Sequence, residues 1–285
     1  MANTINTNVI VPEVYSALVR EKVKGKVKVA QFLVNLGDLH GKVGETIHFP
    51  KWGYIGDAKD WAINTPMEVT QMKQTQTSAT IKAIQAPAVK VADYDNEVEL
   101  GNAIEEASEQ QAIAVGRKYD TDAIACALTS PLKYKLATKN TVTQDEMIGI
   151  LGLYGDDRDS ADFDAIVISS LFAPSFYKMD MFTSRERTMT TDGSGIAVNG
   201  VIGEFLGIPV VLSDRLYDST NTEGFILVMK KNAISIIPKE SPFAEASRDA
   251  GLRQTTIYLS QFYAMALTDD TAVVVAKTVL PNQGK

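Results

Sequence analysis

The sequence predicts an α+β fold in which an arm, a long β-hairpin and a long helix precede a compact region of short helices and strands. Two observations carry this prediction. Residues 43–92 hold two alternating strand patterns around a polar loop, and residues 96–130 are free of proline and periodic as a helix. The chain of 285 residues shows no internal repeat and can bury one large core or two modest ones.

The first element is expected to be a short helix within an arm. Pro12 suits the first turn, where its missing N–H costs nothing. The apolar residues that follow recur at helical spacing: Val14, Tyr15, Leu18 and Val19. After Val23, lysines alternate with valines. We therefore interpret this segment as an arm that covers another surface instead of building a core of its own.

The second element is expected to be an extended hairpin. Residues 45–49 alternate as a strand that stops at Pro50, and the chain returns through residues 80–84 and 89–91. The loop over 51–67 contains Trp52, Tyr54 and Trp61. An isolated hairpin is marginal in water, so it needs a partner surface, on which aromatic residues are typical anchors. The alternative, a platform for stacking bases or sugars, is disfavoured by the charge balance.

The long helix is predicted to begin at a capping box formed by Asn96 and Glu99 and to run toward Ser130. A helix of about 30 residues would be about 45 Å long. Thr143 and Glu146 form a second capping box, which opens a short helix.

The remaining elements are shorter. A short helix is expected over 174–181 and a polar loop over 183–194. Asp269 and Asp270 mark a turn between the last strands. The expected strands cover residues 165–168, 207–212, 225–229, 233–237, 255–259, 263–267 and 272–275.

Composition excludes several classes of function. A net charge of -7 argues against a dedicated nucleic-acid binder, although a protein that only encloses DNA needs no basic excess. Cys126 is the one cysteine, so no intrachain disulfide forms, and its apolar surroundings in the sequence indicate a buried small hydrophobe. Residues 1–11 lack a secretory signal, and no apolar run approaches the about 20 residues of a membrane span.

Three chemical motifs are weighed and set aside. Residues 193–198 begin like a dinucleotide fingerprint, but Val198 stands where the third glycine belongs. His40 and His48 have no third ligand at a metal-binding spacing. Five aspartates cluster without the glycine and distal glutamate of a calcium loop: Asp156, Asp157, Asp159, Asp162 and Asp164. We expect no catalytic residue, metal or cofactor.

Three segments resemble a known family in the same order along the chain: residues 44–52 (GETIHFPKW), 118–124 (KYDTDAI) and 199–210 (NGVIGEFLGIPV). Together with the order of elements, they resemble the major capsid proteins of tailed bacteriophages, a superfamily that includes the bacterial encapsulins. The resemblance covers about residues 12–280.

The resemblance implies the tailed-phage major capsid fold, in which the arm and extended loop reach neighbouring subunits and a spine helix crosses the peripheral domain. The implied divisions are an N-terminal arm (1–42), an extended loop (43–92), a peripheral domain with the spine helix (93–140), an axial domain (141–254) and returning peripheral strands (255–285). Intersubunit contacts are expected at Trp52, Tyr54, Trp61, Arg185 and Arg187, and further intersubunit ion pairs at Arg248 and Arg253.

The implied function is self-assembly into hexamers and pentamers of an icosahedral shell around double-stranded DNA, without catalysis, sequence-specific DNA binding or a membrane. The expected location is the virion, after assembly in the host cytoplasm. Expected partners are other copies, the portal and, because no long cleavable N-terminal extension is present, a separate scaffolding protein. Two alternatives stay open: an encapsulin-like nanocompartment shell and a soluble α/β enzyme.

Overall fold

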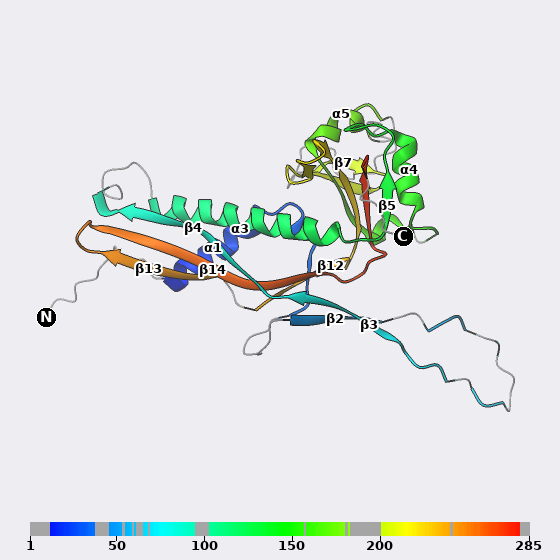
Figure 1. The fold of residues 1–285 in the computed structure, drawn as a ribbon, viewed down its shortest axis with the longest axis horizontal. Coiled ribbons are helices and arrows are strands. Elements are labelled where there is room, and N and C mark those ends of the chain that lie inside the picture. Colours follow the sequence, from blue (N-terminus) through cyan, green and yellow to red (C-terminus); the bar gives the residue numbers. More distant parts are fainter. Residues whose placement is uncertain are drawn as a thin grey trace.

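The structure is a computed structural model, which describes residues 12–37, 46–52, 55–58, 60, 65–67, 69–94, 103–156, 158–179, 182, 201–239 and 242–279. It consists of an elongated layer built on a long helix, a compact unit above one end of that layer, and a two-stranded hairpin that projects below it (Figure 1). The predicted combination of helices and strands is therefore confirmed.

The elongated layer contains the spine helix α3 (Ala103–Ala127) and a sheet beside it. The central strand β14 (Gln254–Leu267) pairs with β4 (Lys82–Ala92) on one side. On the other side it pairs with β13 (Phe243–Asp249) and then β12 (Ile234–Pro238). The strands expected at 255–259 and 263–267 are thus one continuous strand, and β13 is an additional element that the sequence pattern did not reveal.

The arm packs on the spine helix of its own chain. Helix α1 (Pro12–Lys24) buries Tyr15, Val19 and Val23 in the same core as α3. The expectation that the arm contributes nothing to its own core is therefore wrong for this segment. The chain continues through η1 (Ala30–Phe32) to β1 (Val34–Asn35), which pairs in parallel with β12.

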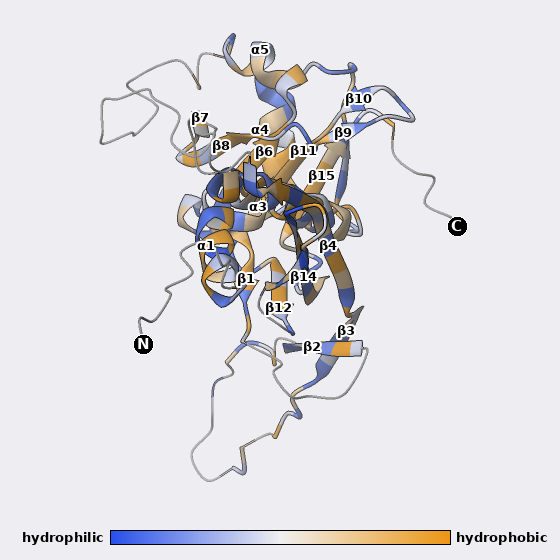
Figure 2. Ribbon diagram, turned by 90° about the vertical axis from the view of Figure 1, so that its left-hand side faces the viewer, coloured by the Kyte–Doolittle hydropathy of each residue, from blue (hydrophilic) through white to orange (hydrophobic). Residues whose placement is uncertain are grey.

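The compact unit contains a six-stranded sheet of mixed direction in the order β5-β15-β11-β6-β8-β7. Its strands are β5 (Lys133–Lys135), β6 (Phe163–Ile168), β7 (Val201–Phe205), β8 (Ile208–Leu212), β11 (Ile226–Lys230) and β15 (Val273–Lys277). A small hairpin of β9 (Tyr217–Asp218) and β10 (Glu223–Gly224) precedes β11. Apolar residues dominate the central strands, as Figure 2 shows.

Alternating side chains of this sheet face two cores, as the two-residue period of a strand requires. Ile166 and Ile168 face the core shared with α4 (Gln144–Gly152), η3 (Ser170–Phe172) and α5 (Ala173–Phe176). Val167 faces the opposite core, which it shares with the spine helix. The compact unit is therefore packed directly against the elongated layer.

Several sequence-based boundaries shift. The capping box at Thr143 is confirmed, with both reciprocal hydrogen bonds present. Helix α5 is shorter than expected and ends at Phe176. A short η2 turn (Ser160–Asp162) precedes β6. The Asn96 capping box and the loop at 183–194 lie outside the described residues.

The two sheets interleave along the chain, so the expected boundary between residues 254 and 255 does not separate them. Strands β12 and β13 precede that boundary but belong to the elongated layer. Strand β15 follows it but pairs in the compact unit. Local patterns identify strands, whereas sheet membership depends on long-range pairing. The names axial and peripheral remain proposals for the compact unit and the elongated layer.

Candidate assembly surface

The projecting hairpin consists of β2 (Thr46–Trp52) and β3 (Gln74–Thr80), and the described strands pair only with each other. Pro50 does not stop β2 as expected, and it lies opposite Gln76 in the ribbon. Proline is tolerated here because both strands of a two-stranded ribbon are edge strands, which do not need every backbone N–H for pairing. Phe49, 1% exposed, packs against Ile237 and Ala266. The hairpin is thus fixed at its root, while β3 is exposed along most of its length.

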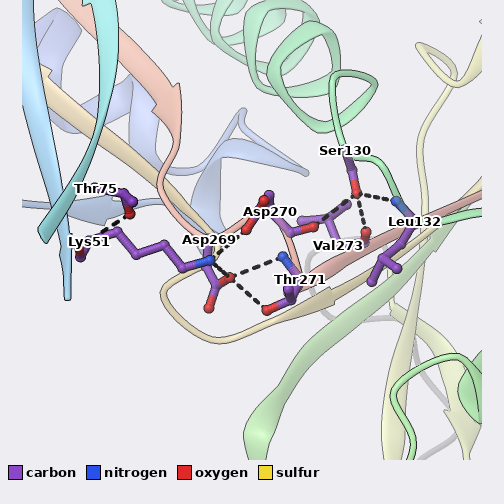
Figure 3. A network of polar contacts seen from close by, with 8 residues as sticks. All are labelled: Lys51, Thr75, Ser130, Leu132, Asp269, Asp270, Thr271 and Val273. Carbon is purple, nitrogen blue, oxygen red and sulfur yellow. Dashed lines mark hydrogen bonds and ion pairs between the residues drawn. The ribbon is translucent and has the colours of Figure 1, made fainter. Parts of the chain in front are cut away.

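An ion pair anchors this root to the turn between β14 and β15 (Figure 3). The ammonium of Lys51 lies 2.8 Å from Oδ1 of Asp269 and also pairs with Asp270. The backbone N–H of Thr271 donates to the same Asp269 oxygen at 3.0 Å. Partial burial favours a higher pKa for Asp269, but Lys51 and Thr271 outweigh it, so the pKa of Asp269 is lowered.

The anchoring turn also contacts the end of the spine helix. The hydroxyl of Ser130 donates to the carbonyl of Val273 at 2.5 Å, and its oxygen accepts from the N–H of Leu132 at 3.2 Å. Figure 3 shows these contacts beside the Lys51 ion pair. Spine helix, hairpin and six-stranded sheet therefore meet at one point, which fixes the direction in which the hairpin leaves the subunit.

We expect the anchor to weaken in acid. A lowered folded-state pKa means that Asp269 stabilises the fold above its unfolded-state pKa of about 3.9, and that this contribution is lost as pH falls through the folded-state value. Lys51→Ala should therefore lower the melting temperature slightly at pH 5 to 7, in keeping with about 1 kcal/mol or less for an exposed pair. This effect should shrink as the pH falls below the unfolded-state pKa of Asp269. Thermal melts across pH would measure this difference.

The control for this prediction is Lys73→Ala, which removes an exposed lysine just before β3. It should change the melting temperature little at any pH. A Lys51→Ala effect that stayed constant from pH 7 down to pH 2.5 would show that the ion pair is not its source.

The segment 118–124, whose sequence resembles the family, holds the elongated layer together. The carboxylate of Asp122 accepts a 2.5 Å hydrogen bond from the hydroxyl of Tyr263. Lys82 and Lys118 lie 3.3 Å and 3.1 Å from its other oxygen. Burial opposes ionisation, yet these donors keep the pKa of Asp122 below its usual range. One carboxylate thereby links α3, β4 and β14.

Asp120, two residues earlier, holds the arm. Its Oδ1 accepts hydrogen bonds from the backbone N–H groups of Val29 at 2.9 Å and Ala30 at 2.8 Å. The N–H of Lys28 completes the set at 3.1 Å. Both aspartates are buried, at 4% exposure each. Sequence reasoning missed these roles, although two acidic residues flanking the apolar side of a predicted helix were a usable signal.

Most of the predicted contact residues lie outside the part of the chain that the structure describes. Trp52 ends β2 opposite Gln74, and its side chain is not described. The other four, Tyr54, Trp61, Arg185 and Arg187, lie outside the described residues. The described part of the structure therefore does not test these five residues, and their contacts remain a prediction.

Arg248, expected in an intersubunit ion pair, forms an ion pair within its own chain. It forms two hydrogen bonds with the carboxylate of Asp93 in its own chain, both 2.6 Å long. Arg253 lies in the turn before β14 with a positive φ of 48°, and its carbonyl accepts from the N–H of Asp93 at 3.0 Å. Both arginines therefore belong to the junction between β4 and the β13–β14 hairpin.

The rejected chemical motifs gain no support. Among the residues that the structure describes, no group of three or more His, Cys, Asp or Glu side chains could hold a metal ion. His48 is exposed on β2, and His40, Asp157 and residues 193–198 lie outside the described part. Cys126 is half-buried instead of fully buried, and burial raises its pKa. No described helix has both the length and the apolar character of a membrane span.

Comparison with known proteins agrees with the geometry. No family model matches the sequence. The chain is 28% identical over 275 residues to the major capsid protein of Staphylococcus phage phiMR11, covering 95% of this chain and 94% of that protein. Its fold resembles the capsid of cyanophage P-SCSP1u (TM-score 0.62, 14% identity, 99% and 94% coverage) and the virus-like particle of Pyrococcus furiosus (TM-score 0.57, 10% identity, 93% and 98% coverage).

The arm, projecting hairpin, spine helix and compact unit thus form the fold of the tailed-phage capsid proteins and their shell-forming relatives. Within that class, the predicted resemblance to a phage major capsid protein is confirmed by the likeness along nearly the whole chain to the phiMR11 protein. This likeness supports a structural role in a virion.

Proposed function

We propose that this chain assembles into hexamers and pentamers that close into an icosahedral shell around double-stranded DNA. The observation that carries this proposal is the projecting hairpin, whose described outer residues are exposed. Large apolar side chains along it remain exposed: Ile55 (58%), Met67 (71%), Val69 (97%) and Met72 (54%). Covering such side chains is worth about 25 cal/mol per Å² of apolar surface, which only a neighbouring copy can supply in a shell of identical subunits.

The arm contributes to the fold of its own subunit, instead of covering a neighbour as the sequence pattern suggested. Because α1 is packed on its own spine helix, residues 12–32 belong to the folded subunit. The energy for assembly must come from the outer hairpin and from the surfaces of the compact unit. Many modest contacts of this kind make a shell stable while leaving each contact weak enough to correct errors.

The proposed partners follow from charge and from the family. A net charge of -7 suits a wall that encloses DNA without adhering to it or reading its sequence. We further propose assembly in the host cytoplasm, with a separate scaffolding protein and the portal as partners, and no catalytic step or cofactor. Trp52, Tyr54, Trp61, Arg185 and Arg187 remain the proposed intersubunit contacts.

An encapsulin-like nanocompartment is the second candidate, because the fold also resembles the virus-like particle of Pyrococcus furiosus. The two candidates differ in cargo. A phage shell should contain nuclease-protected double-stranded DNA when assembled in infected cells, whereas a nanocompartment should contain a protein. A soluble α/β enzyme is disfavoured by the likeness of nearly the whole chain to capsid proteins.

Purified protein should form megadalton particles, which size-exclusion chromatography with light scattering and negative-stain microscopy would detect. We expect closed shells with fivefold and sixfold clusters, alone or after addition of a scaffolding protein. A stable monomer or small oligomer under both conditions would contradict the proposal and favour the enzyme alternative.

A further inference from the structure

A turn in the compact unit adopts a conformation that its sequence does not favour. Leu206 and Gly207 form the two-residue loop between β7 and β8, with φ values of 53° and 79°. Positive φ at both positions defines the type I′ hairpin turn, which favours Asn, Asp or Gly at the first position. Leucine there is strained, because its Cβ crowds the backbone at positive φ.

The hydrophobic core does not explain this leucine, because 46% of Leu206 is exposed. Its side chain lines a surface hollow of about 230 Å³ together with Ile148, Leu151, Phe163 and Ile208. Ile148 is also exposed, at 40%. Arg158 and Ser160 complete the lining. The subunit thus keeps Leu206 in a strained conformation with its side chain exposed to solvent. It lies beside an apolar hollow whose rim carries the guanidinium of Arg158.

A different surface lies at the opposite end of the same sheet. The first residue of β11, Ile226, pairs with Ile168 at the end of β6, whereas Phe163 begins β6 at the other end. The β9–β10 hairpin directly precedes β11 and therefore lies away from the hollow. Figure 2 likewise shows β7 and the β9–β10 hairpin on opposite sides of the compact unit.

This hairpin presents a side chain that suits the hollow. Tyr217 is 45% exposed and is followed by the partly exposed carboxylate of Asp218, whereas Glu223 in the same hairpin is buried. The hairpin is held rigidly, because the N–H of Gly224 donates to Oδ1 of Asn140 at 2.8 Å and the N–H of Val279 donates to Oε1 of Glu223 at 3.2 Å. A rigid hairpin that presents an aromatic side chain next to the Asp218 carboxylate complements an apolar hollow edged by arginine.

We infer that the hollow around Leu206 receives the β9–β10 hairpin of a neighbouring copy, with Tyr217 as the inserted side chain. Two different surfaces at opposite ends of one unit generate head-to-tail contacts, which close into rings when the rotation permits. This inference rests on the proposed function and assigns one of its ring-forming contacts to named residues.

Leu206→Asn tests the role of the hollow in assembly without disturbing the turn, because asparagine suits the backbone conformation at position 206. Asparagine adopts positive φ more readily than leucine, so the melting temperature of the unassembled subunit should stay equal or rise. Particle yield should nevertheless fall to a small fraction of wild type. Leu206→Met, which keeps the apolar contact in the same turn, should assemble. Full assembly of Leu206→Asn would overturn the inference.

A cross-linking experiment tests the pairing itself, in a Cys126→Ala background. Leu206→Cys and Tyr217→Cys subunits are assembled separately and as a mixture, then oxidised. Disulfide-linked dimers should form in the mixture and not in either single variant. Linked dimers in a single variant would indicate a twofold contact, and none in mixed particles would indicate another occupant; either overturns the inference. Absence of particles from wild type would instead reject the proposed function and the inference with it.

Discussion

Replacing residues 53–73 by Asn-Gly should give a subunit that folds normally and no longer forms shells. Trp52 and Gln74 are paired residues, so a two-residue type I′ turn can join them without disturbing the register of β2 and β3. The deletion leaves Lys51 and the Phe49 contact in place. It removes Ile55, Met67, Val69 and Met72, the exposed apolar side chains that we expect to be covered by neighbours.

The measurement is particle yield by light scattering and microscopy, with the melting temperature of the unassembled subunit as the test of folding. A second variant separates apolar burial from chain length: it keeps the full hairpin and changes only Ile55, Val69 and Met72 to serine. If burial on neighbours drives assembly, both variants should lose most of their particles. Normal shells from the truncated variant would disprove the role of the hairpin.

Asp122→Ala should cause a large loss of subunit stability. It leaves the buried hydroxyl of Tyr263 without its acceptor and removes the partner of Lys82 and Lys118. Loss of a buried charged partner costs about 2–4 kcal/mol. Chemical denaturation of the unassembled subunit would measure the free energy of unfolding.

A double-mutant cycle would identify the source of that loss. Tyr263→Phe removes only the hydroxyl and should cost about 1 kcal/mol. If the two side chains act as a pair, the double variant should be less destabilised than the sum of the single variants. Asp249→Ala, at the exposed carboxylate of the last residue of β13, is the matched control and should cost much less. Strict additivity would show that Asp122 acts through its lysines instead.

Local patterns in the sequence determined the identity of most elements. Pro12 and the apolar spacing after it predicted α1, Thr143 and Glu146 predicted the start of α4, and the apolar run at 165–168 predicted β6. These features act over one or two turns of chain, so they could be recognised without knowing what lies nearby. The family resemblance then predicted how the elements are arranged.

Only the tertiary structure decided what each surface faces. The alternation of lysine and valine after Val23 is compatible with covering any apolar surface, and the chain's own spine helix proved to be that surface. Asp120 and Asp122 are buried because partners from distant segments satisfy them, and Leu206 is notable because its φ and exposure are both unusual. Pairing partners, burial and strain depend on contacts between residues far apart in sequence, and a local pattern does not contain them.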